Sequence, residues 1–318
     1  MKALIDFGGA PVFAIPARDG YRGFGGCEGM LVEGPQGWGE FCPPRSSSDL
    51  AAARWLTSAI EGGTVGWPDP IRGRVAVAVA VPAVNAEQAG AIAAESGCRA
   101  ADVVVTGQPD DAARLEAVRA ALGPDGAVRC VVAEAWDAET AAAVIPRLDA
   151  AAGGLEFVQQ PCASAGELAI VRRQVDVRVA ADVSDLGSDG LALSEVADIL
   201  VLDVASLGGV RRALRFAEKC ELPVVVSGAG RTSMGLASGL ALAGALPELP
   251  FASGLGTAAT LAGDIVPAGR VLISDDGFLP VAPSAPAPDP RRVADFAVDD
   301  ADRIAWWRER LQTARELL

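Results

Sequence analysis

From residue 74 onward, short runs rich in β-branched residues alternate with alanine-rich segments of helical length. Seven such strand-like runs occur, at 75–81, 101–105, 128–132, 156–159, 178–181, 199–204 and 223–226. Continuous apolar strands separated by helices are typical of a parallel sheet that is buried on both faces. Seven repeats favour a closed α/β barrel. An open doubly wound sheet usually has a Gly-rich phosphate loop after its first strand, and residues 82–85 contain no glycine.

The segments on either side of this repeat have a different character. Residues 1–73 are rich in Gly, Pro and aromatic residues, with strand-like runs such as 29–33 and a helical stretch near 49–60. We expect them to form a small, mainly antiparallel α+β capping domain. The barrel should then occupy 74–280. Residues 281–318 form a Pro/Ala-rich connector and a last helix, which we expect to pack back against the capping domain.

Composition restricts the class of protein. Of the 318 residues, 51% are apolar and 21% are charged, which indicates a buried globular core. The net charge of −14 argues against nucleic acid as a partner, because phosphates are bound by clustered cations. No secretory signal is recognisable, and no apolar run has the length of a membrane helix. We therefore expect a soluble, cytoplasmic protein with a small-molecule ligand and no membrane partner. The oligomeric state stays open.

The chain contains no histidine, which removes the commonest general base and the commonest transition-metal ligand. Ser-His-Asp and Cys-His catalysis are excluded. Acid–base chemistry would fall to carboxylates, cysteine, tyrosine or one of two lysines, Lys2 and Lys219. The six cysteines are scattered without a zinc-like spacing, and we expect reduced, mostly buried thiols.

Functional side chains of a parallel barrel lie at the carboxyl ends of the strands and in the loops that follow. Three aspartates stand at such positions: Asp102, Asp182 and Asp203. Buried carboxylates can exchange protons if burial raises a pKa, but an aspartate at a strand end more often caps the next helix. Asp203 interrupts an apolar strand, and for it the two interpretations are equally balanced.

Polar loops at the same end of the predicted barrel add further candidates. Ser206 opens a Ser-Leu-Gly-Gly segment that could offer backbone amides to an anion or could form a tight turn. Ser227 and Arg231 belong to a run with three hydroxyl groups, which could bind a ligand or could be a turn followed by a helix cap. Gln159 and Gln160 end a strand with two amides.

Six segments in these regions resemble actinobacterial o-succinylbenzoate synthases, which belong to the enolase superfamily. They lie, in the same order as in that family, at 35–41, 160–163, 180–182, 207–210, 245–250 and 254–257. The resemblance spans nearly the whole chain. It implies an α/β fold: the enolase-superfamily modified TIM barrel, (β/α)₇β, with an N-terminal α+β capping domain.

The resemblance also implies a chemistry and a set of residues for it. The family dehydrates a cyclohexadiene carboxylate: a lysine removes a proton, and Mg²⁺ held by three acidic ligands stabilises the enolate. The family's Lys-x-Lys motif matches Asp102 to Val104, and its opposite lysine matches Asp203. The ligand positions match Val131, Gln159 and Asp182, and Val183 replaces the glutamate that follows the third ligand.

These replacements favour a metal-independent lyase, isomerase or cyclase without a cofactor, acting on a less polar molecule. Val104, Val131 and Val183 would make the pocket more apolar, while Asp102 and Asp203 would shuttle a proton or orient a polar group. A non-catalytic binding or scaffold protein is the alternative. A third hypothesis is an o-succinylbenzoate synthase with a relocated metal, held with the help of Asp102 or Glu134.

The capping domain should contribute one loop to the same pocket. In the family, this loop closes over the substrate, and here it carries Tyr21, Arg22 and Phe24. Gly25 and Gly26 would supply mobility, although a plain glycine-rich turn explains them equally well.

Overall fold

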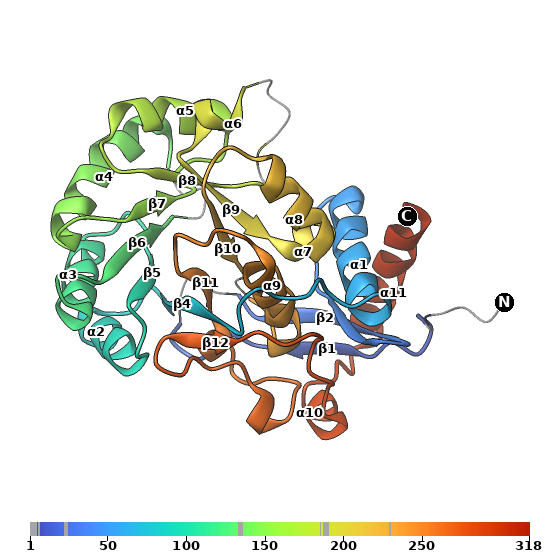
Figure 1. Ribbon diagram of the computed structural model, residues 1–318. Helices are drawn as coiled ribbons and strands as arrows, with labels where there is room; N and C mark the ends of the chain where they lie inside the picture. Colours follow the sequence, from blue (N-terminus) through green and yellow to red (C-terminus); the bar gives the residue numbers. More distant parts are fainter. Residues whose placement is uncertain are drawn as a thin grey trace.

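The computed structural model describes residues 5, 7–21, 25–132, 136–184, 186, 191–228 and 230–318. Its first part is a three-stranded antiparallel sheet of β1 (Val12–Ile15), β2 (Cys27–Gly34) and β3 (Gly37–Phe41), with β2 in the centre. Helix α1 (Asp49–Thr64) packs on β3 (Figure 1). Gly39 permits this contact, because an added Cβ would lie 2.0 Å from the carbonyl oxygen of Ala59.

Eight parallel strands then close into a barrel in sequence order, because the last strand pairs with the first. The strands are β4 (Arg74–Val81), β5 (Ala100–Val104), β6 (Ala127–Val131), β7 (Phe157–Gln159), β8 (Val179–Asp182), β9 (Ile199–Asp203), β10 (Val224–Ser227) and β11 (Ser253–Gly256). A short strand, β12 (Phe278–Pro280), pairs antiparallel with β4 outside the barrel. The predicted fold class is confirmed.

Helices connect the strands on the outside of the barrel (Figure 1). They are α2 (Ala86–Glu95), α3 (Asp110–Leu122), α4 (Ala138–Ala152), α5 (Ala165–Gln174), α6 (Leu193–Val196), α7 (Val204–Leu207), α8 (Val210–Lys219) and α9 (Ser233–Ala245). Several begin with a side-chain cap: Asn85, Asp137, Ser164 and Thr232 each accept a hydrogen bond from a backbone N–H of the first turn. Such caps satisfy N–H groups that have no partner within the helix.

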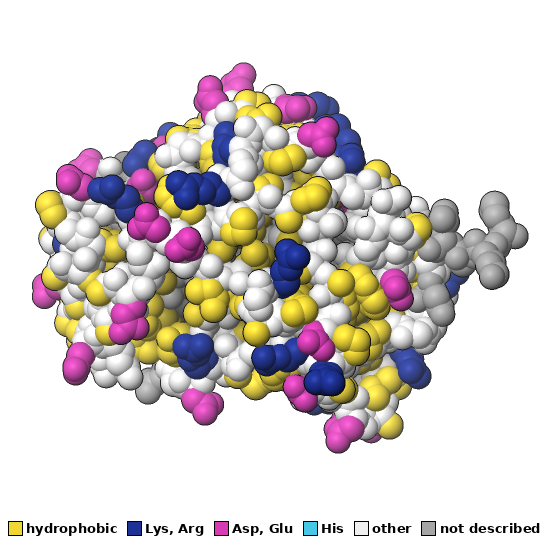
Figure 2. All heavy atoms as spheres, turned by 60° about the horizontal axis from the view of Figure 1, so that its bottom comes forward, with side chains coloured by type: hydrophobic (Ala, Val, Ile, Leu, Met, Phe, Trp, Pro, Cys, Tyr) yellow, Lys and Arg dark blue, Asp and Glu magenta, His cyan; other side chains and the backbone are white. Residues whose placement is uncertain are grey.

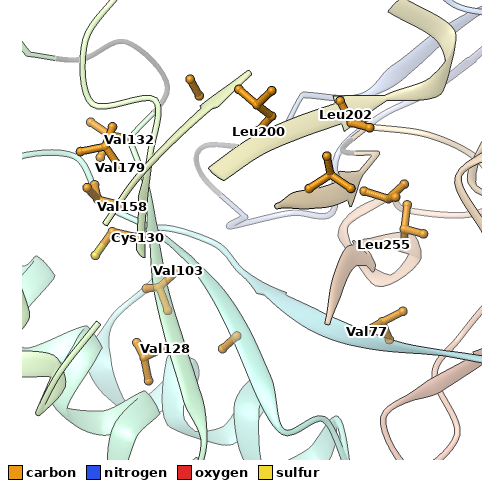
Figure 3. Close-up of a cluster of buried hydrophobic side chains, with 14 of the residues drawn as sticks. Val77, Val103, Val128, Cys130, Val132, Val158, Val179, Leu200, Leu202 and Leu255 are labelled. Carbon is orange, nitrogen blue, oxygen red and sulfur yellow. The ribbon is translucent and has the colours of Figure 1, made fainter. Parts of the chain in front are cut away.

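Alternation along the strands sorts side chains between two hydrophobic clusters. Outward-facing residues pack under the helices; Figure 3 labels Val77, Val103, Val128, Cys130, Val132, Val158, Val179, Leu200, Leu202 and Leu255. A smaller cluster contains Phe157, Ala180, Ile199, Val201, Val225 and Phe251. Its strand members alternate with outward-facing residues, so they fill the barrel interior. Burial on both faces explains the continuous apolar runs in the sequence.

The eighth strand differs from the seven runs recognised by their β-branched residues. It has only four residues, Ser-Gly-Leu-Gly, and its glycines allow a close approach to β4. A Cβ on Gly256 would lie 2.3 Å from the carbonyl oxygen of Ala78. Its residues belong to a segment that carried the family resemblance, but composition alone does not identify it as a strand.

The C-terminal segment returns to the first part of the chain, after α10 (Pro290–Asp295). Helix α11 (Ala301–Glu316) lies beside α1 (Figure 1). Trp307 on α11 is fully buried and donates a hydrogen bond from Nε1 to a carboxylate oxygen of Glu28, at 2.7 Å. The ring of Phe41 meets its indole edge to face, with centroids 6.1 Å apart.

The surface shows no segregation of charge on the face drawn in Figure 2, where acidic and basic side chains are interspersed with apolar ones. Within the described ranges, no helix combines the length and the apolar character that crossing a bilayer requires.

Candidate functional site at the mouth of the barrel

Six consecutive barrel strands, β5 to β10, end on residues that the sequence singled out. Their last residues are Val104, Val131, Gln159, Asp182, Asp203 and Ser227. Parallel strands all point the same way, so these residues share the carboxyl-terminal rim of the barrel. The rim is therefore partly apolar, at β5 and β6, and polar from β7 to β10.

Asp203 is held on both carboxylate oxygens. Its Oδ1 accepts hydrogen bonds from the backbone N–H groups of Ala205 at 2.8 Å and Ser206 at 3.1 Å, so it caps α7. Its Oδ2 forms an ion pair with Arg231. The guanidinium of Arg231 lies 3.7 Å from the ring centroid of Trp55, which belongs to α1. Asp203 thus both caps a helix and joins an ion pair at the mouth.

The electrostatic setting of Arg231 keeps it charged. Burial alone would lower the pKa of this guanidinium, but the negative charges of Asp203 and Glu40 raise it above its usual value. Glu40 is itself buried, and burial raises its pKa to about 7 although Arg231 and Thr232 act in the opposite direction. Arg231 therefore links the mouth of the barrel to the interior of the capping sheet.

Asp182 and Gln159 form the second polar pair at the rim. Nε2 of Gln159 donates to both carboxylate oxygens of Asp182, at 2.9 and 3.2 Å. Gln160 has a structural role instead. It is buried with a left-handed φ of 48°, its Oε1 accepts the backbone N–H of Asp182 at 2.8 Å, and its Nε2 donates to the carbonyl of Cys162 at 3.0 Å.

Asp102 lies deeper than the rim, two residues before the end of β5. Its Oδ1 is 3.3 Å from Nη1 of Arg129. Its Oδ2 and the hydroxyl of Ser227 both approach Gly254, where an added Cβ would lie 2.8 and 3.2 Å from them. Burial raises the pKa of Asp102, and the positive charge of Arg129 opposes that shift. The side chain keeps 15% of its surface exposed.

Arg129 is the residue that sequence reasoning missed. It is fully buried on β6 and bonds Glu156 through Nε at 2.6 Å and the carbonyl of Ala252 through Nη1 at 2.9 Å. The ring centroid of Phe157 lies 4.7 Å from its guanidinium. Within the described ranges, Nη2 has no hydrogen-bond partner. The sequence did contain a signal for it, because an arginine at an inward-facing position of an otherwise apolar strand needs polar partners inside the barrel.

The remaining predicted residues have varied environments. Val104 is buried and Val131 half-buried, and neither belongs to the cluster under the helices. Val183, in contrast, packs against that outer cluster. Half-buried Tyr21 also packs against it and lies under the guanidinium of Arg18. Ser206 donates its hydroxyl to the carbonyl of Asp203 at 2.9 Å.

Three predicted site residues, Arg22, Phe24 and Glu134, lie outside the described residues. Their predicted contributions to the pocket stay predictions.

Comparison with known proteins agrees with this architecture. The profile of the enolase C-terminal domain-like family matches residues 85–286, and that of the enolase N-terminal domain-like family matches residues 12–63. The chain belongs to the enolase superfamily. Within it, the chain is 47% identical to an o-succinylbenzoate synthase from Thermobifida fusca over 314 residues, covering 95% of both chains. It is 39% identical to the o-succinylbenzoate synthase of Mycobacterium leprae, covering 96% of this chain and 91% of that one.

Solved structures of this superfamily share the fold at much lower identity. Muconate cycloisomerase from Pseudomonas fluorescens is 18% identical, with a TM-score of 0.71, and the match covers 93% of this chain and 98% of that one. The L-Ala-D/L-Glu epimerase from Bacillus subtilis is 16% identical, with a TM-score of 0.71, and the match covers 91% and 98%. The resemblance to o-succinylbenzoate synthases found in the sequence is confirmed, and so is the barrel with its N-terminal domain.

Proposed function

We propose that this protein is a metal-independent lyase, isomerase or cyclase that acts on a small, weakly polar molecule at the mouth of the barrel. The observation that carries the proposal is the set of side chains at the ends of β5 to β8: two valines, a glutamine and one aspartate. Valines at two adjacent strand ends would suit an apolar part of a substrate. Gln159 and Asp182 would then orient a polar group.

The same residues do not fit the Mg²⁺ site of related o-succinylbenzoate synthases. Mg²⁺ prefers near-octahedral oxygen ligands, with carboxylates to balance its charge. At the three positions that match the family's ligands, only Asp182 is a carboxylate, Val131 has no ligand atom, and Gln159 is neutral. The nitrogen of the Gln159 amide also points at the Asp182 carboxylate, where a cation would have to lie.

The misfit predicts the outcome of a magnesium titration. By calorimetry, we expect no saturable binding of Mg²⁺ at micromolar concentration, because one carboxylate cannot compensate for dehydration of the ion. The matched comparison is the double variant Val131→Asp/Gln159→Glu, which would supply three carboxylates and should bind the ion more tightly. Wild-type protein that binds Mg²⁺ as tightly as the double variant would contradict the proposal and favour an o-succinylbenzoate synthase with a relocated metal.

Asp102 is the proposed acid–base residue. Burial raises the pKa of Asp102, and its side chain is not fully buried. A raised pKa makes a carboxyl group a better proton donor and acceptor near neutral pH. Asp203 would have a structural role instead, because its Oδ1 caps α7 and its Oδ2 pairs with Arg231.

The test is turnover in the presence of EDTA, assayed for dehydration to o-succinylbenzoate, lactone formation and epimerisation. We expect activity that resists EDTA and falls by about 10²–10⁴ in Asp102→Asn, with KM changed much less than kcat. Asp125→Asn, at an exposed position, is the control and should keep full activity. If the Asp102→Asn variant keeps the EDTA-resistant turnover, Asp102 is not the acid–base residue.

A non-catalytic binding protein is the second candidate, and one specific observation favours it. Both predicted acid–base carboxylates already have a buried arginine as partner, Arg129 for Asp102 and Arg231 for Asp203. Such pairs can be purely structural. Absence of turnover, together with a rise in Tm on adding a small molecule of the assay panel, would support this alternative.

A further inference from the structure

Two cysteines and a glutamate meet in the interior of the capping sheet, next to Arg231. Cys27 begins β2, Glu40 lies in β3, and Cys42 follows the end of β3. The Sγ atoms of Cys27 and Cys42 are 3.7 Å apart, and Sγ of Cys27 is 4.0 Å from Oε1 of Glu40. All three residues are buried, and their ligand atoms lie within 4.8 Å of one another.

The spacing of these atoms matches one kind of metal coordination. A tetrahedral Zn²⁺ ion with Zn–S bonds of about 2.3 Å separates two sulfur ligands by about 3.8 Å. The observed sulfur separation of 3.7 Å agrees with that edge. The distance from Sγ of Cys27 to Oε1 of Glu40, 4.0 Å, is about half an ångström longer than the sulfur–oxygen edge of such an ion.

The surroundings orient Glu40 and leave room for Cys42. Thr232 donates its hydroxyl to Oε2 of Glu40, and Oε1 faces Sγ of Cys27. Gly29 makes room for the second sulfur, because a Cβ there would lie 2.3 Å from Sγ of Cys42. Hydrogen bonds to a ligating carboxylate and a shaped cavity around the donor atoms are characteristic of metal sites in proteins.

A buried cation lies beside the cluster. Two thiolates and one carboxylate around a divalent ion carry a net charge of −1, and a buried cluster with an uncompensated charge is costly. The guanidinium of Arg231 is buried and its positive charge acts on Glu40 and Cys42, although Asp203 shares it. Arg231 therefore offsets part of the negative charge around the loaded cluster.

A cavity of about 520 Å³ borders the cluster. Cys27 and Cys42 line it, together with Trp55, Arg231 and Trp307. With three protein ligands, water or a small ligand from this cavity could complete a tetrahedral coordination.

We propose that Cys27, Glu40 and Cys42 form a binding site for a thiophilic divalent ion of the Zn²⁺ class, within the capping domain and composed of other residues than those at the strand ends. The site does not depend on the function proposed above. It differs from a Mg²⁺ site in its soft thiolate ligands, which Mg²⁺ does not accept.

The test is a spectroscopic titration of the full chain, kept reduced with a phosphine and stripped of metal with a chelator. A count of six free thiols under denaturing conditions verifies the reduced state before the titration. One equivalent of Co²⁺ should produce thiolate-to-cobalt charge-transfer absorption and the visible bands of a tetrahedral ion. One equivalent of Zn²⁺ should abolish both, and excess Mg²⁺ should change neither.

Variants connect the signal to the cluster. Cys27→Ala and Cys42→Ala should each abolish the charge-transfer absorption at one equivalent of Co²⁺, and Glu40→Gln should weaken binding at least tenfold. Cys220→Ala, a thiol outside the cluster, should leave the titration unchanged. A folded, reduced protein without the absorption would overturn the proposal, and so would absorption that persists in Cys27→Ala. If circular dichroism shows that an alanine variant does not fold, the nearly isosteric Glu40→Gln variant still tests the site. Unchanged Co²⁺ affinity in that variant would overturn the proposal.

Discussion

Replacement of Arg129 by leucine should lower the free energy of unfolding by about 3 kcal/mol, near the lower end of the range for breaking a buried ion pair. The change removes the common partner of Asp102 and Glu156, whose side chains are only 15% and 21% exposed. Both carboxylates would then lose this ion-pair partner. Urea unfolding followed by circular dichroism measures the effect.

The pH dependence of this loss has a definite sign. Arg129 opposes the rise in the pKa of Asp102, so its removal should move that pKa further above 3.8. The folded variant then binds the proton more tightly than the unfolded chain, and its stability falls as the pH rises through the folded pKa. The difference between variant and parent should therefore be smaller at about pH 5 than at about pH 8.

Two further variants define what would contradict this account. Arg147→Leu, on the exposed face of α4, should change stability by no more than about 0.5 kcal/mol. Adding Asp102→Asn to Arg129→Leu should recover about 1 kcal/mol, because the two residues are directly coupled. An Arg129→Leu variant as stable as Arg147→Leu would mean that the interior ion pairs contribute nothing to stability.

Truncation of Trp307 to alanine is the second large effect, with an expected loss of about 3–5 kcal/mol. The indole is fully buried between α11 and the capping sheet, contacts the ring of Phe41, and donates its N–H to Glu28. The variant would leave both a cavity and a carboxylate that lacks one of its hydrogen-bond donors. Denaturant unfolding measures the loss, and near-ultraviolet circular dichroism reports the altered aromatic packing.

The neighbouring tryptophan is the matched control. Trp306 is only half-buried, and its main polar contact is the guanidinium of Arg45, 4.4 Å from the ring centroid. Trp306→Ala should cost about 1 kcal/mol. Equal losses in the two variants would argue against Trp307 as the principal anchor of α11.

The barrel and the positions of its rim residues follow from the amino-acid sequence alone. A period of two within each apolar run assigns every strand residue to one of two faces, and parallel strands bring all carboxyl ends to one edge. This reasoning places Val104, Val131, Gln159, Asp182 and Asp203 at one mouth, but it also placed Asp102 there, and Asp102 lies two residues before the end of β5. The same reasoning does not identify the final strand, β11, because two of its four residues are glycines and give no pattern of apolar side chains.

The pairing of these groups, in contrast, depends on how the chain packs in three dimensions. Asp203 meets Arg231, Asp102 meets Arg129, and Cys27 meets Cys42 because of barrel closure, strand register and the packing of the capping sheet. Alternation along a strand gives the face of a residue but not the side chain that lies across the barrel from it. Local periodicity arises from neighbouring residues in the chain, whereas ion pairs and ligand clusters arise from contacts between distant ones.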